Sequence, residues 1–254
     1  METINNEFWQ FNIIFNKKHY DYFKEVFVNL KQNDIFINAG GVVCLEADRL
    51  LIAVKREYET KVKSILKAKI IKILTENYKF DYFLSNIAKL DLLGKLKPIF
   101  LKVLTMFDSE QEILQVEKYL RLNDTLYLNE FFYFKLKDLQ KKWKEICDMT
   151  NDNSFFFTTD SLVFELIRFL LNSSKPKKDF LTINILNDKF YLLDENNNQI
   201  YEQNVTDDYE NLIVKILDNY PKRIYLKNYE KLSRDMSNLM YSMFKNNLKP
   251  LYFA

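Results

Sequence analysis

Few residues of this chain have the types and spacing that nucleophilic or metal chemistry needs. The sequence holds a single histidine, His19, and two cysteines, Cys44 and Cys147, which lie far apart and outside any paired motif. A Ser/His/Asp or Cys/His arrangement would have to use His19, which opens a predicted helix, where a capping or surface role is far commoner. The same three residues lack the close pairs that fix zinc ligands at tetrahedral spacing. We therefore predict no catalytic residue and no metal site.

One polar segment imitates a calcium-binding loop. Asp194, Asn196 and Asn198 have the spacing of the first ligands. Gln199, however, stands where such a loop needs glycine, and Val205 stands where it needs a bidentate glutamate. A hairpin turn is the better interpretation of this segment.

Glycine is scarce, which argues against a phosphate-cradling loop. The chain has 3 glycines and no Walker motif or dinucleotide-binding fingerprint, so we predict no cofactor. Carboxylate pairs suited to acid/base work can be distant in sequence, and nothing selects one pair among the 35 acidic residues. The sequence therefore favours a protein that is not an enzyme, with an uncharacterised enzyme as an open alternative.

Two local lysine clusters are the remaining candidates for function. One forms a stripe on a predicted helix, opposite Trp143, and the other lies in a loop that precedes a predicted hairpin. If the clusters converge, they could bind a phosphate backbone, although solvated faces of a lysine-rich chain look the same. The candidates for nucleic-acid or partner binding are Lys137, Lys141, Lys144, Lys175, Lys177 and Lys178.

The overall composition indicates a globular protein without a strong global charge. Hydrophobic residues make up 48% of the 254 residues, and 37 Lys and Arg against 35 Asp and Glu give a net charge of +2. No apolar run approaches the roughly 18 residues of a spanning helix, the N-terminus does not resemble a cleaved signal peptide, and the sparse cysteines fit a reducing compartment. We expect a cytoplasmic protein without a membrane span, with a protein partner or, as an alternative, nucleic acid.

The sequence pattern predicts an α+β fold in three segments, and the elements of these segments position the candidate residues. For residues 1–58 the pattern predicts a small α+β unit, with strands at 8–15, 42–45 and 50–54 and a helix at 19–31. Residues 59–150 read as mostly helical, with helices at 59–89, 99–107, 110–120 and about 135–149. Residues 126–134 are ambiguous, because alternation favours a short strand or an extended lead-in. The last of these helices places Leu136, Leu139, Trp143, Ile146 and Cys147 on one face.

The third segment, residues 151–254, reads as an α+β region with a central buried helix and a hairpin. Residues 151–154 are the best linker candidate, and the helix at 162–171 is apolar on nearly every side. After Pro176 an antiparallel hairpin follows, with its turn at Asn187 and Asp188. The remaining expected elements are strands at 199–201, 223–226 and 250–253 and helices at 207–217 and 229–244.

Two aromatic runs could serve either the core or a partner. They are residues 131–134 and residues 155–157. Such runs are more often core, but alternation means that not all members can point the same way. We expect some exposed aromatic residue near the predicted linker.

From about Leu90 onward, the order of the predicted elements and the local sequence resemble the YtxC family of sporulation proteins from endospore-forming bacteria. Three places carry the likeness: residues 97–108, residues 128–138, and the passage from residues 164–171 through Pro176 into the hairpin. The resemblance covers about two-thirds of the chain and consists of structural patterns. It implies a cytoplasmic protein linked to sporulation, with no established activity to carry over. Together with the missing catalytic motifs, it leads us to expect a non-enzymatic binding or interaction protein.

Overall fold

The computed structural model describes residues 7–245 and 247–250 and divides into two compact units. The first unit contains Met1–Tyr82 and Ser109–Ile146, and the second contains Phe83–Asp108 and Cys147–Ala254. Each unit is thus built from two separate stretches of chain, and each is described by itself below. The fold class is α+β, as expected from the sequence, with one sheet in each unit. The division into segments 1–58, 59–150 and 151–254 stays a prediction.

The sheet of the first unit has four strands in the order β2-β3-β1-β4. They are β1 (Phe8–Ile14), β2 (Val42–Leu45), β3 (Arg49–Lys55) and β4 (Thr125–Tyr127). Neighbouring strands are antiparallel except β1 and β4, which are parallel. Successive side chains of a strand point to opposite faces, and one face buries Trp9, Phe11, Ile13, Leu50, Ile52 and Val54. The three strands predicted in residues 1–58 are confirmed.

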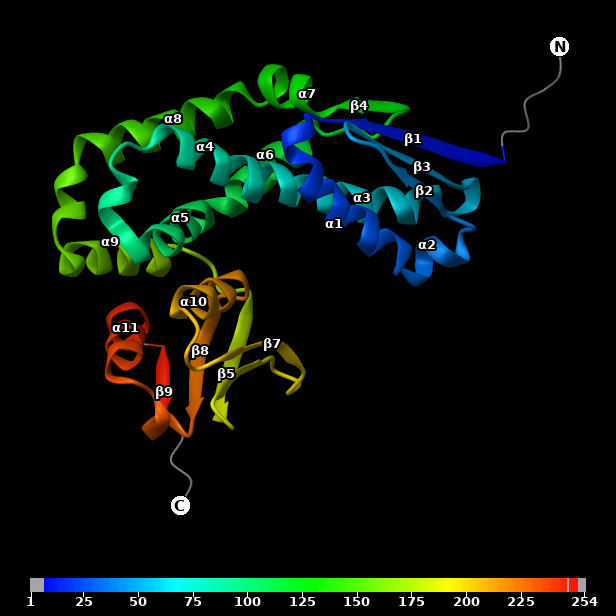
Figure 1. The fold of residues 1–254 in the computed structure, drawn as a ribbon. Helices are drawn as coiled ribbons and strands as arrows, with labels where there is room; N and C mark the ends of the chain where they lie inside the picture. Colours follow the sequence, from blue (N-terminus) through cyan, green and yellow to red (C-terminus); the bar gives the residue numbers. More distant parts are fainter. Residues whose placement is uncertain (1–6, 246, 251–254) are drawn as a thin grey trace, which may run out of the picture. The chain divides into compact units, whose positions relative to one another are not determined.

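Helices cover this buried face of the sheet. Figure 1 shows α1, α2 and α3 on the same side of the strands. Helix α2 ends where Gly40 adopts a left-handed φ of 61°, a conformation that glycine tolerates without a steric penalty. The helical elements of the first unit are η1 (Lys17–His19), α1 (Tyr20–Lys31), α2 (Asp34–Asn38), η2 (Arg56–Tyr58), α3 (Glu59–Lys72), the π-helical turn η3 (Ile73–Tyr78), α6 (Ser109–Tyr119) and α7 (Leu128–Lys135). Two helices, α4 (Lys79–Asn86) and α8 (Lys137–Asp152), pass from this unit into the second.

The ambiguous stretch 126–134 resolves into two elements. Strand β4 takes only Thr125–Tyr127, and the aromatic run that follows is helical, in α7. The preference for an extended conformation is therefore wrong for residues 128–134. Helical periodicity explains the correction, because Leu128, Phe131 and Phe132 are buried while Tyr133 and Phe134 are exposed.

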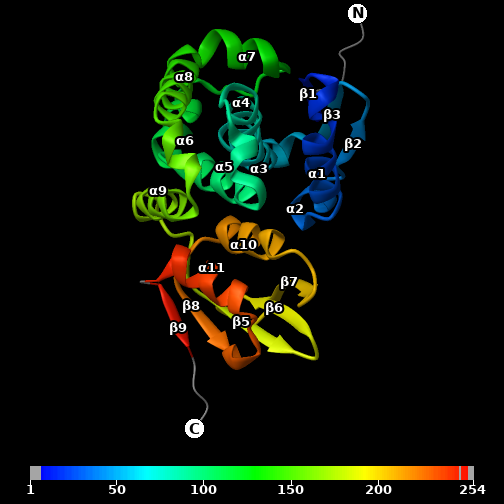
Figure 2. The same ribbon diagram turned by 60° about the vertical axis from the view of Figure 1, so that its left-hand side comes forward.

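The second unit places a five-stranded sheet beside helices. Strand order is β7-β6-β5-β8-β9. Figure 2 shows α10 and α11 next to this sheet. The elements are 3-10 turn η4 (Leu90–Leu96), α5 (Lys97–Met106), η5 (Ser154–Thr158), α9 (Asp160–Asn172), β5 (Lys178–Leu186), β6 (Lys189–Leu193), β7 (Gln199–Asn204), α10 (Tyr209–Asp218), β8 (Pro221–Lys227), η6 (Tyr229–Lys231), α11 (Arg234–Phe244) and β9 (Leu248–Pro250).

The predicted hairpin is confirmed, but the sheet around it is mixed. Strands β5 and β6 pair antiparallel across a turn in which Asn187 and Asp188 have φ of 50° and 55°, as a two-residue type I′ turn requires. Strands β8 and β9 join in parallel. The antiparallel pairing expected for the hairpin therefore does not extend to these two strands, because a helix precedes each of them and lets the chain cross over to a parallel position. Of the predicted strand 250–253, only Pro250 lies within the described residues.

Helix α9 is amphipathic and not a helix buried on most sides. Its buried residues, Val163, Ile167, Leu170 and Leu171, follow the 3.6-residue period on one face. Phe169 is 63% exposed. The expected linker at 151–154 is also largely helical, since α8 continues through Asp152 and η5 begins at Ser154.

Candidate functional site

The face of the first unit's sheet opposite its helices is partly exposed: Phe8, Val42 and Tyr127 are exposed, whereas Asn12, Ile14, Leu51 and Ala53 are half-buried. The register aligns Gln10, Ala53 and Val42 in one row across the strands, and Asn12 and Leu51 in the next. We define the open face by the side chains on this side: Phe8, Gln10, Asn12, Ile14, Val42, Cys44, Arg49, Leu51, Ala53, Lys55, Thr125 and Tyr127. It comes from strands that lie far apart in sequence, because β4 is added from residues 125–127.

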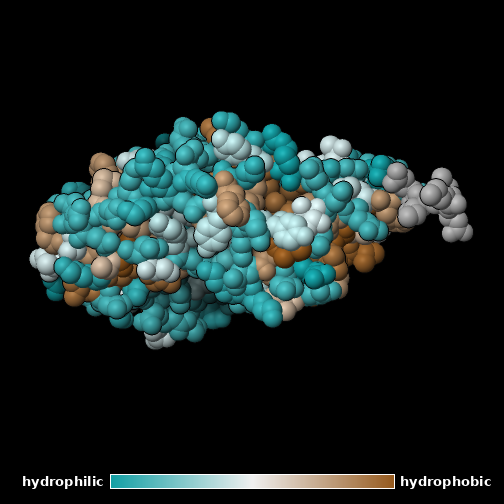
Figure 3. All heavy atoms as spheres, turned by 90° about the horizontal axis from the view of Figure 1, so that it is seen from above, coloured by the Kyte–Doolittle hydropathy of each residue, from teal (hydrophilic) through white to brown (hydrophobic). Residues whose placement is uncertain are grey.

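The open face mixes apolar and polar side chains and is hollowed. Phe8, Val42 and Tyr127 are 48%, 65% and 53% exposed, and a depression of about 860 Å³ lies over the strands. Figure 3 shows hydrophobic surface gathered over this part of the molecule, toward the right of the view. An antiparallel sheet that faces water normally alternates apolar and polar residues. On this face three large apolar side chains, Phe8, Val42 and Tyr127, are exposed, and exposed apolar surface of this kind is a feature of interaction sites.

The lining of this depression combines apolar, amide and charged side chains. Arg56 and Asp124 supply its charged groups, Cys44 is exposed, and the lining contains no histidine. Asn12 contributes an Oδ1 atom that is buried and accepts no hydrogen bond from any described residue. The arrangement is therefore suited to binding.

His19 lies elsewhere in the first unit and is buried just before α1, not at the surface. Its ring centroid lies 4.2 Å from that of Tyr78 and 5.7 Å from that of Tyr22. Its Nε2 is 3.6 Å from Oδ2 of Asp81. Burial lowers the pKa of His19 to about 4, with Lys18 acting in the same direction and Asp81 opposing both. The imidazole is thus neutral at pH 7, and Nδ1 has no hydrogen-bond partner among the described residues.

The tyrosines around His19 complete a cluster of polar groups. The Tyr22 hydroxyl donates to Asp81 Oδ1 at 3.0 Å, and the Tyr78 hydroxyl donates to Asn129 Oδ1 at 2.8 Å. Burial raises the pKa of Tyr22 to about 12 and raises that of Tyr78 further. Both hydroxyls therefore stay protonated at neutral pH and serve as hydrogen-bond donors.

A buried ion pair joins three helices of the same unit. Lys79 Nζ lies 2.9 Å from Glu112 Oε2, and the Trp143 indole donates to Glu112 Oε1 at 2.9 Å. The side chains of Lys79 and Glu112 are fully buried. Burial raises the pKa of the Glu112 carboxyl, while Lys79 and Trp143 act to lower it. No pattern in the sequence marks this pair, because its members lie 33 residues apart and read as ordinary charged helix positions.

The six candidate lysines fall into different units. Lys137, Lys141 and Lys144 are exposed on α8, opposite the buried Trp143, as expected from their spacing. Lys175 and Lys177 are exposed before β5, and the half-buried Lys178 begins that strand. Neither unit by itself contains both clusters, so their convergence stays a prediction.

The nucleic-acid alternative makes a testable prediction of its own. Lys137→Glu and Lys178→Glu should each weaken binding to a single-stranded or duplex oligonucleotide. Each lost phosphate contact should also reduce the slope of log K against log salt by about 0.7–0.9. Fluorescence anisotropy over a salt series measures both effects, and Lys24→Glu, an exposed position on α1 outside the clusters, is the matched control. Binding that is absent or insensitive to salt would exclude this function.

The aromatic runs and the calcium-like segment have clear structural positions. Phe155 is exposed in η5 beside the buried Phe157, as we expected for an aromatic residue near the predicted linker. Asp194 Oδ1 accepts hydrogen bonds from the backbone amides of Asn196 and Asn198 at 2.9 and 2.8 Å. This segment therefore forms the turn between β6 and β7.

Comparisons with protein-family models, with curated proteins and with solved structures returned no match. Within residues 7–245 and 247–250, no three His, Cys, Asp or Glu side chains gather closely enough to hold a metal ion. None of the helices in the described part of the chain combines the length and apolar character needed to cross a membrane.

Proposed function

We propose that this chain is a non-enzymatic interaction protein and that a protein partner docks on the open face of the first unit's sheet. The exposed apolar surface of Phe8, Val42 and Tyr127 carries the proposal. We also propose, from the YtxC-like segments alone, that it acts in the cytoplasm of a sporulating bacterium. An uncharacterised enzyme is the alternative for which the described side chains offer the least support.

The chemistry of the open face defines the kind of partner that fits. Its two central strands contribute Leu51 and Ala53 next to the amides of Gln10 and Asn12, and Arg56 and Asp124 add charged groups to the lining. Burying one fully exposed aliphatic or aromatic side chain contributes about 1.5–3 kcal/mol, so a few residues of this face could supply most of the affinity. A partner with an apolar helix face or sheet face would fit the depression.

Val42→Glu is expected to abolish partner binding while leaving the fold intact. Val42 is 65% exposed on the edge strand β2, so the substitution removes little core packing but places a charge in the apolar interface. The measurement is quantitative affinity capture from the native host, followed by circular dichroism and thermal unfolding of the purified variant.

Leu114→Glu is the matched control for this experiment. Leu114 is 59% exposed on α6 of the same unit and lies outside the open face. A stoichiometric partner that the wild-type chain and the control retain, and that Val42→Glu loses, would support the proposal. Identical captured proteins for all three chains, or no stoichiometric partner, would contradict it.

A further inference from the structure

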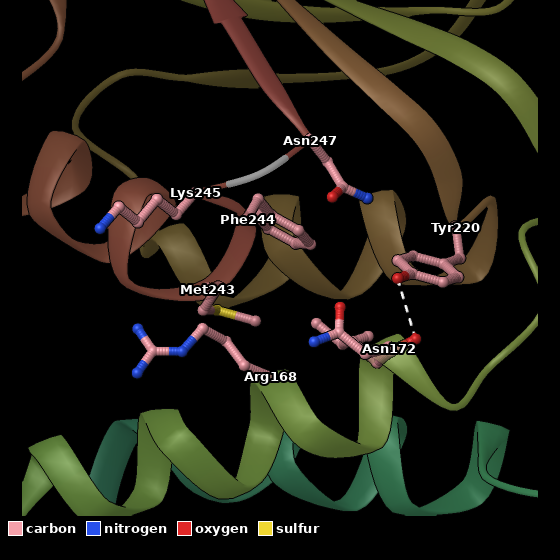
Figure 4. A pocket seen from close by; sticks show the side chains of 8 residues that line it. Arg168, Asn172, Tyr220, Met243, Phe244, Lys245 and Asn247 are labelled. Carbon is pink, nitrogen blue, oxygen red and sulfur yellow. Dashed lines mark hydrogen bonds between the residues drawn. The ribbon is translucent and has the colours of Figure 1, made fainter.

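A second, smaller pocket lies within the second unit, between the ends of two helices. It has a volume of about 340 Å³, which is within the range of small-molecule sites. Arg168 and Asn172 project from α9, Lys245 follows the end of α11, and Asn247 precedes β9. Figure 4 shows the Asn172 and Asn247 side chains pointing toward one another, with Arg168 and Lys245 near the opposite end of the pocket.

The charged residues that line this pocket are all cations. Neither Arg168 nor Lys245 forms an ion pair with any carboxylate of the described residues, and the lining includes no Asp or Glu. One N–H of Arg168 donates to the Ser242 carbonyl at 3.0 Å. The guanidinium has four further N–H donors, so most of its hydrogen-bonding capacity is available to a ligand.

The ends of two helices oppose this positive charge only in part. The C-terminus of a helix carries roughly half a negative charge, and both α9 and α11 end at this pocket. Some of their terminal carbonyls already accept hydrogen bonds: Leu171 from the Tyr220 hydroxyl at 3.0 Å, and Ser242 from Arg168. The two full charges therefore outweigh the helix ends, and an excess of donors faces the pocket.

We propose that this pocket binds the oxyanion group of a small molecule, a carboxylate or a phosphate. The Arg168 fork and the Lys245 ammonium would hold the anionic oxygens, since charge-assisted hydrogen bonds are the strongest that these groups form. The amides of Asn172 and Asn247 would contact the neighbouring polar atoms of the ligand. This inference concerns a different surface from the proposed protein interface and does not depend on it.

The experiment is a titration of the full chain with inorganic phosphate and, separately, with succinate, at constant ionic strength maintained with chloride. Side-chain amide signals in nitrogen-15 NMR report on Asn172 and Asn247, and isothermal titration calorimetry gives the affinity. Saturable binding of at least one probe is expected. Phosphate binding alone would assign a phosphorylated ligand, and succinate binding alone a carboxylate.

Variants locate the binding at this pocket. Lys245→Gln and Arg168→Lys should each weaken the affinity by about tenfold or more, because each removes a charge-assisted contact or the guanidinium fork. Lys245 is exposed, so its substitution leaves the fold intact. Lys231→Gln, an exposed lysine of the same unit outside the pocket, should have no effect. Absence of saturable binding for both probes, or binding that Lys245→Gln does not weaken, would overturn the proposal.

Discussion

A Lys79→Met variant is expected to lose about 3–5 kcal/mol of its free energy of unfolding at neutral pH. This is the typical loss when one member of a buried ion pair is removed and the other charge stays behind. Methionine preserves most of the side-chain volume. The loss therefore measures the cost of leaving the Glu112 carboxylate without its ion-pair partner, fully buried beside the Trp143 indole. Urea denaturation followed by fluorescence measures the change.

A second substitution distinguishes the effect of the unpaired Glu112 carboxylate from the effect of the packing that is lost with the Lys79 side chain. Lys79→Met combined with Glu112→Gln removes both charges but keeps an oxygen that can accept the Trp143 N–H at the position of Oε1. The double variant should therefore be more stable than Lys79→Met alone, since replacing a buried pair with neutral groups is often tolerated. A double variant no more stable than the single one would show that packing, and not the unpaired carboxylate, causes the loss.

Acid is expected to destabilise the fold through His19. Its pKa is about 4 in the folded chain and 6.5 when unperturbed, so between these values the unfolded chain holds a proton that the folded chain does not. The stabilisation is fully present above pH 6.5 and is lost as the pH falls toward 4. At about 1.4 kcal/mol for each pKa unit, the loss between pH 7.5 and 4.5 should be about 2–3 kcal/mol.

His19→Phe should remove this part of the pH dependence. Phenylalanine keeps an aromatic ring against Tyr22 and Tyr78 and removes the Nδ1 atom that lacks a partner. Chemical denaturation of both chains at the two pH values gives the difference, in which the titration of all other groups largely cancels. Equal losses in wild type and variant would contradict the assignment of the effect to His19.

Local pattern was sufficient for most elements of this fold. The stripe of Leu136, Leu139, Trp143, Ile146 and Cys147 on α8 follows the helical period, and all five side chains are buried. The turn at Asn187 and Asp188 was equally predictable from the sequence, because few other dipeptides tolerate two positive φ angles. The prediction of an extended conformation for residues 128–134 was wrong because aromatic residues favour strands locally, while packing in the first unit selected a helix.

The candidate sites were harder to predict because they depend on contacts between distant segments. The open face requires β4 to pair with β1 across more than a hundred residues. One signal was present: β1 carries apolar residues at both parities, with Phe8 and Ile14 on one face and Trp9, Phe11 and Ile13 on the other. Apolar residues on both faces of a strand favour a covered sheet, whereas here the side of Phe8 and Ile14 also carries Gln10 and Asn12 and is partly exposed. The pocket at Arg168 and Lys245 is lined by three separate stretches of the chain, so no local sequence pattern indicated it.

The discontinuous units also affect how the chain folds during synthesis. All segments of the first unit have been made once residue 146 has emerged, but Phe83–Asp108 belongs to the second unit, whose other segment begins only at Cys147. Helix α5 lies in the stretch Phe83–Asp108, and its buried residues include Ile99, Phe100, Leu101, Val103 and Leu104. A nascent chain therefore carries an apolar helix without the α9 and α10 surfaces that later pack on it. Such exposure favours aggregation, so ribosome-associated chaperones would protect this protein most between the completion of its first unit and the synthesis of α10.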